Sequence, residues 1–136
     1  MKWFSLSLIC VLLGLSTAAS GQATIERKFK GKPATDINVG VFTSIHRNCT
    51  PARLPVVRLV APPAHGKVTV KQAHLRATNF KQCLGAELPA FVAYYRSAYN
   101  YIGQDVFTLE VVAANGKAQL QRITVTVMKP GSGQGI

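Results

Sequence analysis

Apolar and polar residues alternate along most of the chain after its first twenty positions. In residues 24–32, TIERKFKGK, Ile25 and Phe29 share one side and charged residues take the other. A period of two is typical of a strand with one buried face. Further short apolar or alternating segments occur at 37–45, 56–61, 67–72, 75–80, 91–96, 105–114 and 119–127. The pattern therefore predicts seven or eight short strands and little helix.

Turn-forming residues separate these segments. Residues 46–55, HRNCTPARLP, and 81–89, KQCLGAELP, have the composition of loops, and Asn115-Gly116 is the strongest short signal for a hairpin. Short strands joined by such turns predict an all-β fold. We expect an Ig-like antiparallel β-sandwich of about seven strands.

The first twenty residues, MKWFSLSLICVLLGLSTAAS, predict a signal peptide that is cleaved. Lys2 precedes an apolar run at 3–15, and small residues follow it. The run is shorter than the ~20 residues that span a bilayer, so a membrane anchor is the weaker alternative. Residues 21–129 then form one domain by size, and the tail at 130–136 is expected to be disordered. The protein is predicted to be periplasmic or secreted, with no integral membrane segment after cleavage.

Two cysteines remain once Cys10 leaves with the signal peptide. Cys49 and Cys83 are an even number in an exported chain, which predicts a disulfide bond. A redox or metal site would need a CxxC motif or a Cys/His cluster, and the sequence has neither. We therefore expect a structural disulfide, no metal and no cofactor.

The charge of the chain is strongly positive, with 16 Lys and Arg against 5 acids and a formal net charge of +11. Such a surplus favours anionic partners, among them polysaccharides and lipid headgroups. The alternative is a basic, solvated surface without a dedicated ligand. Composition alone leaves both open.

Several cations occupy positions at which they can share a face. Lys28, Lys30 and Lys32 alternate along the first predicted strand, although lysines on an edge strand also protect against aggregation. The predicted basic face consists of Lys28, Lys30, Lys32, Arg47, Arg53, Arg58, Lys67 and Lys71. Nucleic acid is an unlikely partner because the tyrosines that would stack on bases are expected to belong to the sandwich and its corner. These are Tyr94, Tyr95, Tyr99 and Tyr101.

Four motifs in order, PPAHGKVTV, FVAYYR, YNYIGQDVFTLEVV and ITVTV, resemble those of bacterial Ig-like, cadherin-like domains. The resemblance covers residues 56–127. The sequence departs from the family pattern at Arg96 and Ser97, where proline is common, and at Leu109, where an aromatic is common. The resemblance implies a β-sandwich module of surface, periplasmic or secreted proteins, of the kind used in cell adhesion or as a spacer.

The segment around Asp105 is expected to build a structural corner. Gly103 is predicted to take a backbone conformation that a side chain would penalise, and Asp105 to cap the amides of a turn. Phe107, on the same strand, is predicted to enter the core. With Tyr101 at the corner, this spacing indicates a fold and not a site.

No motif in the sequence indicates catalysis. His46, His65 and His74 fall in different predicted turns or strand ends, and neither a GxSxG, an HExxH nor a glycine-rich phosphate loop occurs. We therefore predict no catalytic residue. The expected function is a non-catalytic exported module that binds an anionic, polysaccharide-like envelope or extracellular ligand. The alternative is a protein-interaction subunit that docks by a strand edge onto a larger cell-envelope or adhesion assembly.

Overall fold

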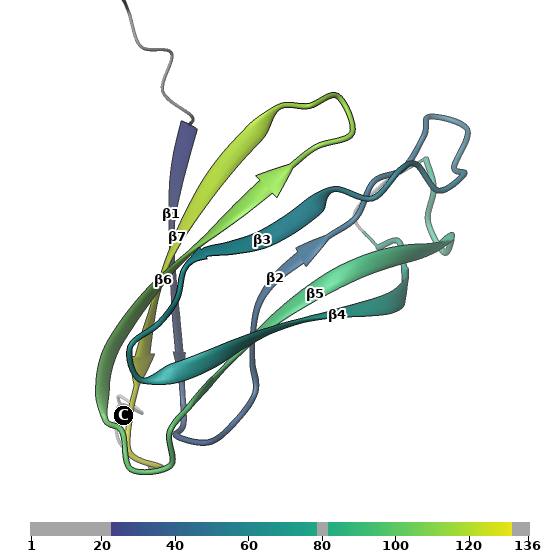
Figure 1. The fold of residues 1–136 in the computed structure, drawn as a ribbon. Coiled ribbons are helices and arrows are strands. Elements are labelled where there is room, and N and C mark those ends of the chain that lie inside the picture. Colours follow the sequence, from purple (N-terminus) through teal and green to yellow (C-terminus); the bar gives the residue numbers. More distant parts are fainter. Residues whose placement is uncertain (1–22, 79–81, 132–136) are drawn as a thin grey trace, which may run out of the picture.

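The computed structural model describes residues 23–78 and 82–131. The predicted signal peptide lies outside these residues, and so does the tail beyond residue 131. The described residues form seven strands and no helix, which confirms the all-β prediction (Figure 1). The strands are β1 (Ala23–Gly31), β2 (Ile37–Phe42), β3 (Val56–Ala61), β4 (Gly66–Arg76), β5 (Glu87–Ser97), β6 (Gly103–Val112) and β7 (Ala118–Val127).

The strands form two sheets packed face to face as a sandwich (Figure 1). The four-stranded sheet has the order β1-β7-β6-β3, and the three-stranded sheet has the order β2-β5-β4. Neighbouring strands are antiparallel except β1, which runs parallel to β7. Strand direction carries no signal in a period-two pattern, so the parallel pair was not foreseeable from the alternation alone.

The hairpin of β4 and β5 is longer than the sequence pattern indicated. A separate strand was predicted at 75–80, but residues 75 and 76 belong to β4, which continues unbroken to Arg76; residues 77 and 78 are not in a strand, and residues 79 and 80 lie outside the described residues. Leu75 of β4 pairs with Leu88, so β5 begins inside the segment predicted as a loop at 81–89. Glycine and polar residues in that segment conceal the strand, because the pairing with β4 decides where β5 starts.

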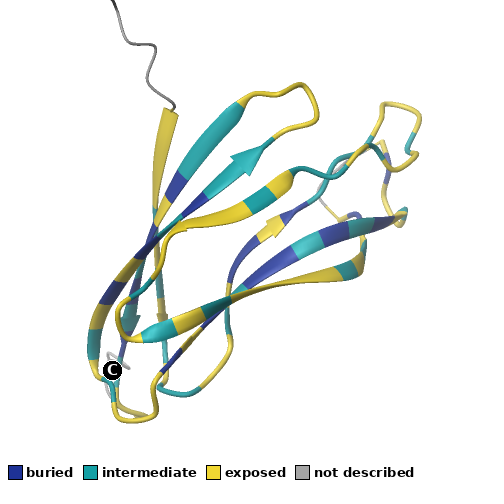
Figure 2. Ribbon diagram, in the orientation of Figure 1, coloured by how far each residue is buried: buried dark blue, intermediate teal, exposed yellow. Residues whose placement is uncertain are grey.

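The core lies between the two sheets and takes alternate residues from their strands, seen as alternating dark bands in Figure 2. On β6, Phe107 and Leu109 are buried and Val106 is exposed, as the alternation predicts. The central cluster consists of Val39, Phe42, Ala93, Tyr95, Phe107, Leu109, Ile123, Val125 and Val127. On β7 every second residue from Gln121 to Val127 is buried, whereas on β5 the alternation changes at Val92 and Ala93, which are both buried.

A buried carboxylate connects the two sheets. Asp105 on β6 accepts hydrogen bonds at Oδ1 from the amides of Ala64 (3.0 Å) and Val106 (3.1 Å). Its Oδ2 accepts from the amide of His65 (3.0 Å) and from the hydroxyl of Tyr95 (2.7 Å). Asp105 therefore caps a turn as predicted, and that turn is the one before β4, about forty residues away in sequence.

The corner predicted around Asp105 is present. The ring of Tyr101 stacks on His65 with 4.0 Å between centroids and 7° between planes, and its hydroxyl donates to the carbonyl of Gln104. Gly103 has φ +140°, and a Cβ there would lie 3.1 Å from the Tyr101 hydroxyl. The backbone conformation therefore favours glycine, and a side chain here would also crowd the Tyr101 hydroxyl.

The predicted disulfide between Cys49 and Cys83 is also present. It joins the loop after β2 to the loop after β4, at the opposite end of the sandwich from the turn capped by Asp105 (Figure 1). Closing this loop stabilises the fold by about 3–4 kcal/mol in the chain-entropy model. A disulfide of this kind indicates an oxidising compartment outside the cytoplasm. Within the described part of the chain, no helix is long and apolar enough to cross a membrane.

Replacing Asp105 by Asn should lower the free energy of unfolding by about 3 kcal/mol, measured by urea denaturation. The side-chain amide of asparagine has only one oxygen to accept from the four donors around position 105. Its NH₂ group would point toward the other two donors. Asp36→Asn is the matched control, because Asp36 is exposed and makes only an exposed ion pair with Arg96. That change should stay within about 0.5 kcal/mol of the wild type. Equal losses in the two variants would contradict the role assigned to Asp105.

Stability should also fall at alkaline pH because of Tyr95. Burial, together with the hydrogen bond to Asp105, raises the pKa of Tyr95 well above its usual value. The folded state therefore keeps the phenolic proton, whereas the unfolded state releases it above about pH 10. The free energy of unfolding that Tyr95 contributes is fully present below that pH and falls above it, by about 1.4 kcal/mol per pH unit. Urea denaturation between about pH 9 and 11 should show this slope in the wild type and in the exposed control Tyr99→Phe. In Tyr95→Phe the free energy of unfolding should fall less steeply with pH, by the contribution of one proton. An unchanged slope would exclude Tyr95 as its source.

Candidate ligand-binding face

The outer face of the three-stranded sheet presents cations around one aromatic ring. On β5, Tyr95 is buried in the core, so its neighbours Tyr94 and Arg96 face outward. On β4, Val68 packs against the core, so Lys67 and the residues at alternate positions after it face outward as well. We call four of these outward residues, Lys67, Lys71, Tyr94 and Arg96, the basic patch.

The register of β4 and β5 places two cations of the patch directly opposite each other. Lys67 pairs with Arg96 across the strands, and both side chains are exposed. Tyr94 is the nearest outward neighbour of Arg96 on β5. The Lys71 Nζ lies 5.6 Å from the centroid of the Tyr94 ring. Like charges at directly opposed positions destabilise a sheet, so we expect this pair to lower the stability of the fold.

Acidic residues are scarce around the patch. Asp36 contacts Arg96 with 3.4 Å between Oδ1 and Nη1, but both side chains are about half exposed and such pairs contribute little. No acid occurs between residues 37 and 86, a segment that supplies β2, β3 and β4. The same segment has seven cations, Arg47, Arg53, Arg58, Lys67, Lys71, Arg76 and Lys81.

A hollow adjoins the opposed cations at the end of β4 and β5. Its lining consists of Ala64, His65, Gly66, Lys67, Arg96, Ser97 and Ala98. A Cβ on Gly66 would lie 2.6 Å from the Arg96 carbonyl oxygen, so glycine allows the close approach of the two strands here. Since Lys67 and Arg96 both line it, the hollow fits a small anionic group such as a carboxylate or sulfate.

The other end of the same outer face is different in character. A second hollow there is lined by Val41, Thr43, Leu75, Arg76, Ala77, Thr78 and Leu88. Among the described residues its lining is largely apolar, and Arg76 is the charged member. The positive charge and the exposed ring of the outer face are therefore concentrated toward the end with Lys67 and Arg96.

The structure brings together only part of the predicted basic face. Lys67 and Lys71 lie on the basic patch, whereas Lys28 and Lys30 project from the outer face of the other sheet, at its β1 edge. Lys32 follows the end of β1, and Arg47 and Arg53 lie in the loop between β2 and β3. Arg58 on β3 forms an ion pair with Glu110. The alternation shows which residues share one side of a strand, but it does not show which sheet that strand joins.

Arg96 and Tyr94 belong to the basic patch but were not among the residues predicted for the basic face. All four tyrosines were expected to belong to the sandwich and its corner, which is wrong for Tyr99, 83% exposed in the turn before β6. Tyr94 does lie on β5 of the sandwich, but its ring is on the outer face, because two consecutive strand residues face opposite sides and Tyr95 already faces the core. The FVAYYR alternation, applied strictly, would have placed Arg96 and Tyr94 on one outer face.

The histidines do not gather into a site. His46 lies in the loop after β2, His65 stacks on Tyr101 and His74 lies on β4. In residues 23–78 and 82–131, no group of three or more His, Cys, Asp or Glu side chains is arranged to hold a metal ion. The basic patch is therefore the best-defined candidate among the described residues.

Comparisons with family models, with curated proteins and with solved structures found no match to the chain. The resemblance to cadherin-like domains therefore stays a prediction.

Lys67→Glu should make the fold more stable than Lys30→Glu by about 0.5–1 kcal/mol. Both changes replace an exposed strand lysine by glutamate, but Lys67 is directly opposite Arg96, whereas Lys30 is opposite Thr126, so only the glutamate at 67 gains a cross-strand pair with a cation. Urea denaturation of the two variants at low salt measures the difference. No difference would show that the opposed cations do not repel each other appreciably.

Proposed function

We propose that the protein is a non-catalytic module that binds an anionic polysaccharide outside the cytoplasm, through the basic patch. The observation that carries the proposal is the direct opposition of Lys67 and Arg96 beside the ring of Tyr94. A carboxylate or sulfate between the two cations would remove their repulsion. Binding would thus recover free energy that the unbound fold gives up.

Tyr94 supports a sugar as the anionic ligand. Its ring is partly exposed on the sheet and has an apolar face with a polar tip. The apolar side of a sugar ring can pack on such a face while neighbouring lysines contact its anionic groups. A nucleic acid would require more stacking surfaces than this one ring offers.

The spacing of the patch suits a polymer with repeated charges. Lys67 and Lys71 are four residues apart on one strand, a separation of about 13 Å. Charges at this distance engage successive units of a chain rather than one small molecule. Each contact with a polyanion releases counterions, so affinity should fall steeply as salt rises.

Compartment and chemistry agree with this proposal. The disulfide indicates an oxidising environment, in which envelope and extracellular polysaccharides occur. The patch itself has neither a nucleophile beside a base nor a pair of carboxylates, so the proposal includes no catalytic step. It does not depend on the resemblance to cadherin-like domains.

Retention on immobilised heparin and on immobilised polygalacturonate, eluted with a salt gradient, tests the proposal. The wild type should elute late, and Lys67→Ser/Arg96→Ser should elute at clearly lower salt. Lys28→Ser/Lys30→Ser is the matched control, because it removes the same charge from the outer face of the other sheet. Circular dichroism should confirm that all three proteins are folded.

Two results would contradict the proposal. If both double variants elute equally early, retention reflects total charge and not the patch. If a short DNA duplex displaces the protein from polygalacturonate more effectively than free polygalacturonate does, the ligand class is wrong. A Tyr94→Ser variant should weaken binding to the polysaccharide even though its charge is unchanged.

A further inference from the structure

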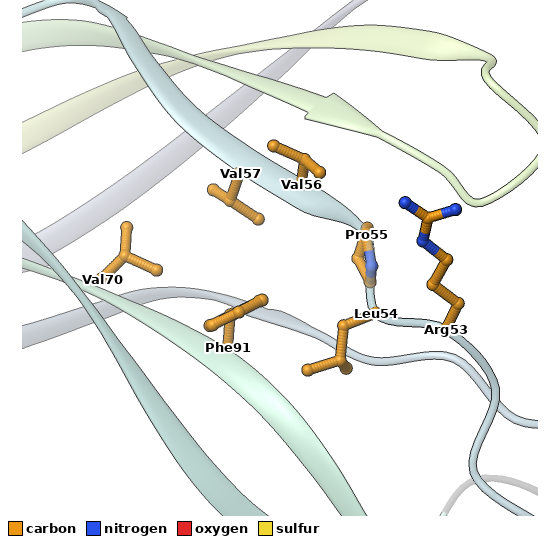
Figure 3. Close-up of a pocket in the computed structure, with 7 residues that line it drawn as sticks. All are labelled: Arg53, Leu54, Pro55, Val56, Val57, Val70 and Phe91. Atoms are coloured by element: carbon orange, nitrogen blue, oxygen red, sulfur yellow. The ribbon is translucent and has the colours of Figure 1, made fainter.

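An apolar groove lies between the two sheets where their edge strands β3 and β4 face each other. Its volume is about 350 Å³, and its lining consists of Arg53, Leu54, Pro55, Val56, Val57, Val70 and Phe91. Figure 3 shows Val57 from β3 and Val70 and Phe91 from the facing sheet pointing toward the same space. The sandwich is thus open on this side, and its apolar interior is accessible.

Apolar side chains are exposed along both borders of the groove. Val56 is 51% exposed on β3 and Val70 is 37% exposed on β4. Val60, also on β3, is exposed as well. Apolar side chains grouped along unpaired strand edges are typical of surfaces that contact another chain.

Of the two edges, β4 is the one suited to accept an additional strand. It has eleven residues, it pairs with β5 in unbroken register from Gly66 to Arg76, and it contains no proline. In contrast, β3 has six residues, a register shift between Leu59 and Ala61, and prolines directly before and after it. Short length, bulges and prolines all hinder strand addition.

A strand added to β4 would have two chemically different sides. Side chains directed inward would enter the groove beside Val57, Val70 and Phe91. Side chains directed outward would lie beside Lys67 and Lys71. Arg53, which lines the groove near one end, adds a third cation.

We infer that the groove and the free edge of β4 bind an extended segment of another protein in which apolar residues alternate with acidic ones. Backbone hydrogen bonds to β4 would supply part of the affinity. The groove on one side and the lysines on the other would select a segment in which apolar and acidic residues alternate. The acidic residues are required because residues 37–86 provide cations and no acid. A second copy of this chain is a poor occupant, since each copy has a formal net charge of +11. This site goes beyond the polysaccharide proposal: it adds the edge of β4 and the groove, and it shares Lys67 and Lys71 with the basic patch.

Binding of synthetic peptides to the oxidised protein, followed by fluorescence anisotropy, tests the inference. The probe is a peptide of about eight alternating Val and Glu residues, the length of an ordinary strand. We expect it to bind at least about tenfold more tightly than a Ser/Glu peptide of equal charge, since one buried valine accounts for that factor. A Val/Lys peptide should not bind. Equal affinity for the Val/Glu and Ser/Glu peptides would show that charge alone attracts them and would overturn the inference.

Two N-methylated forms of the Val/Glu peptide test whether it adds as a strand. Methyl groups on alternate residues block the amides along one edge of the peptide only. One form should lose binding and the complementary form should keep it, because only one edge faces β4. Equal binding by both forms would exclude strand addition.

Variants of the protein locate the site. Val70→Asn should weaken binding of the Val/Glu peptide roughly tenfold, the factor expected for one lost valine contact. Val41→Asn is the matched control, because Val41 is a similarly exposed valine on β2, the opposite edge of the same sheet. A larger effect of Val41→Asn would place the site at β2 and overturn the inference. Sedimentation of the wild type completes the test: a dimer that Val70→Asn dissociates would show that the occupant is a second copy.

Discussion

The carboxylate of Asp105 is the contact on which the arrangement of the two sheets depends. It lies on a strand of the four-stranded sheet and accepts hydrogen bonds from the turn that leads into β4 and from Tyr95 in the three-stranded sheet. A buried charge is unfavourable unless hydrogen bonds satisfy it, so the turn and Tyr95 must be in place for the carboxylate to be buried. The same turn begins the strand that provides Lys67 and borders the groove. The start of β4, the strand that both proposed surfaces use, is therefore positioned by one buried group at the opposite end of the sandwich from the disulfide.

The sequence was sufficient for the fold class, the disulfide and the corner. Alternation identified the strands, because burial on one side of a strand leaves a period of two, and the spacing of Gly103, Asp105 and Phe107 indicated structure correctly. It was not sufficient for the grouping of the cations. Lys28 and Lys67 both alternate with apolar residues, yet they lie on different sheets. Pairing between strands far apart in sequence decides that, and it also brings Arg96 opposite Lys67.

The two proposed surfaces share the strand β4 and its outward lysines. Its outward side chains bear the charge of the basic patch, and its backbone edge and inward side chains border the apolar groove. A sheet edge that bears lysines is protected from pairing with the same edge of a second copy, because the two sets of positive charges repel each other. The same lysines leave the edge open to an acidic strand. Protection from self-association and selection of a partner thus follow from one set of charges.

The parallel pairing of β1 with β7 has a mechanical consequence. Because the two strands run in the same direction, the start of β1 and the end of β7 lie at opposite ends of the sheet. A pulling force applied at these two points would load all the hydrogen bonds between β1 and β7 at once, along the strands, instead of opening them one after another. Such a geometry resists extension in shear. A domain built in this way can remain folded while it transmits tension between its two ends.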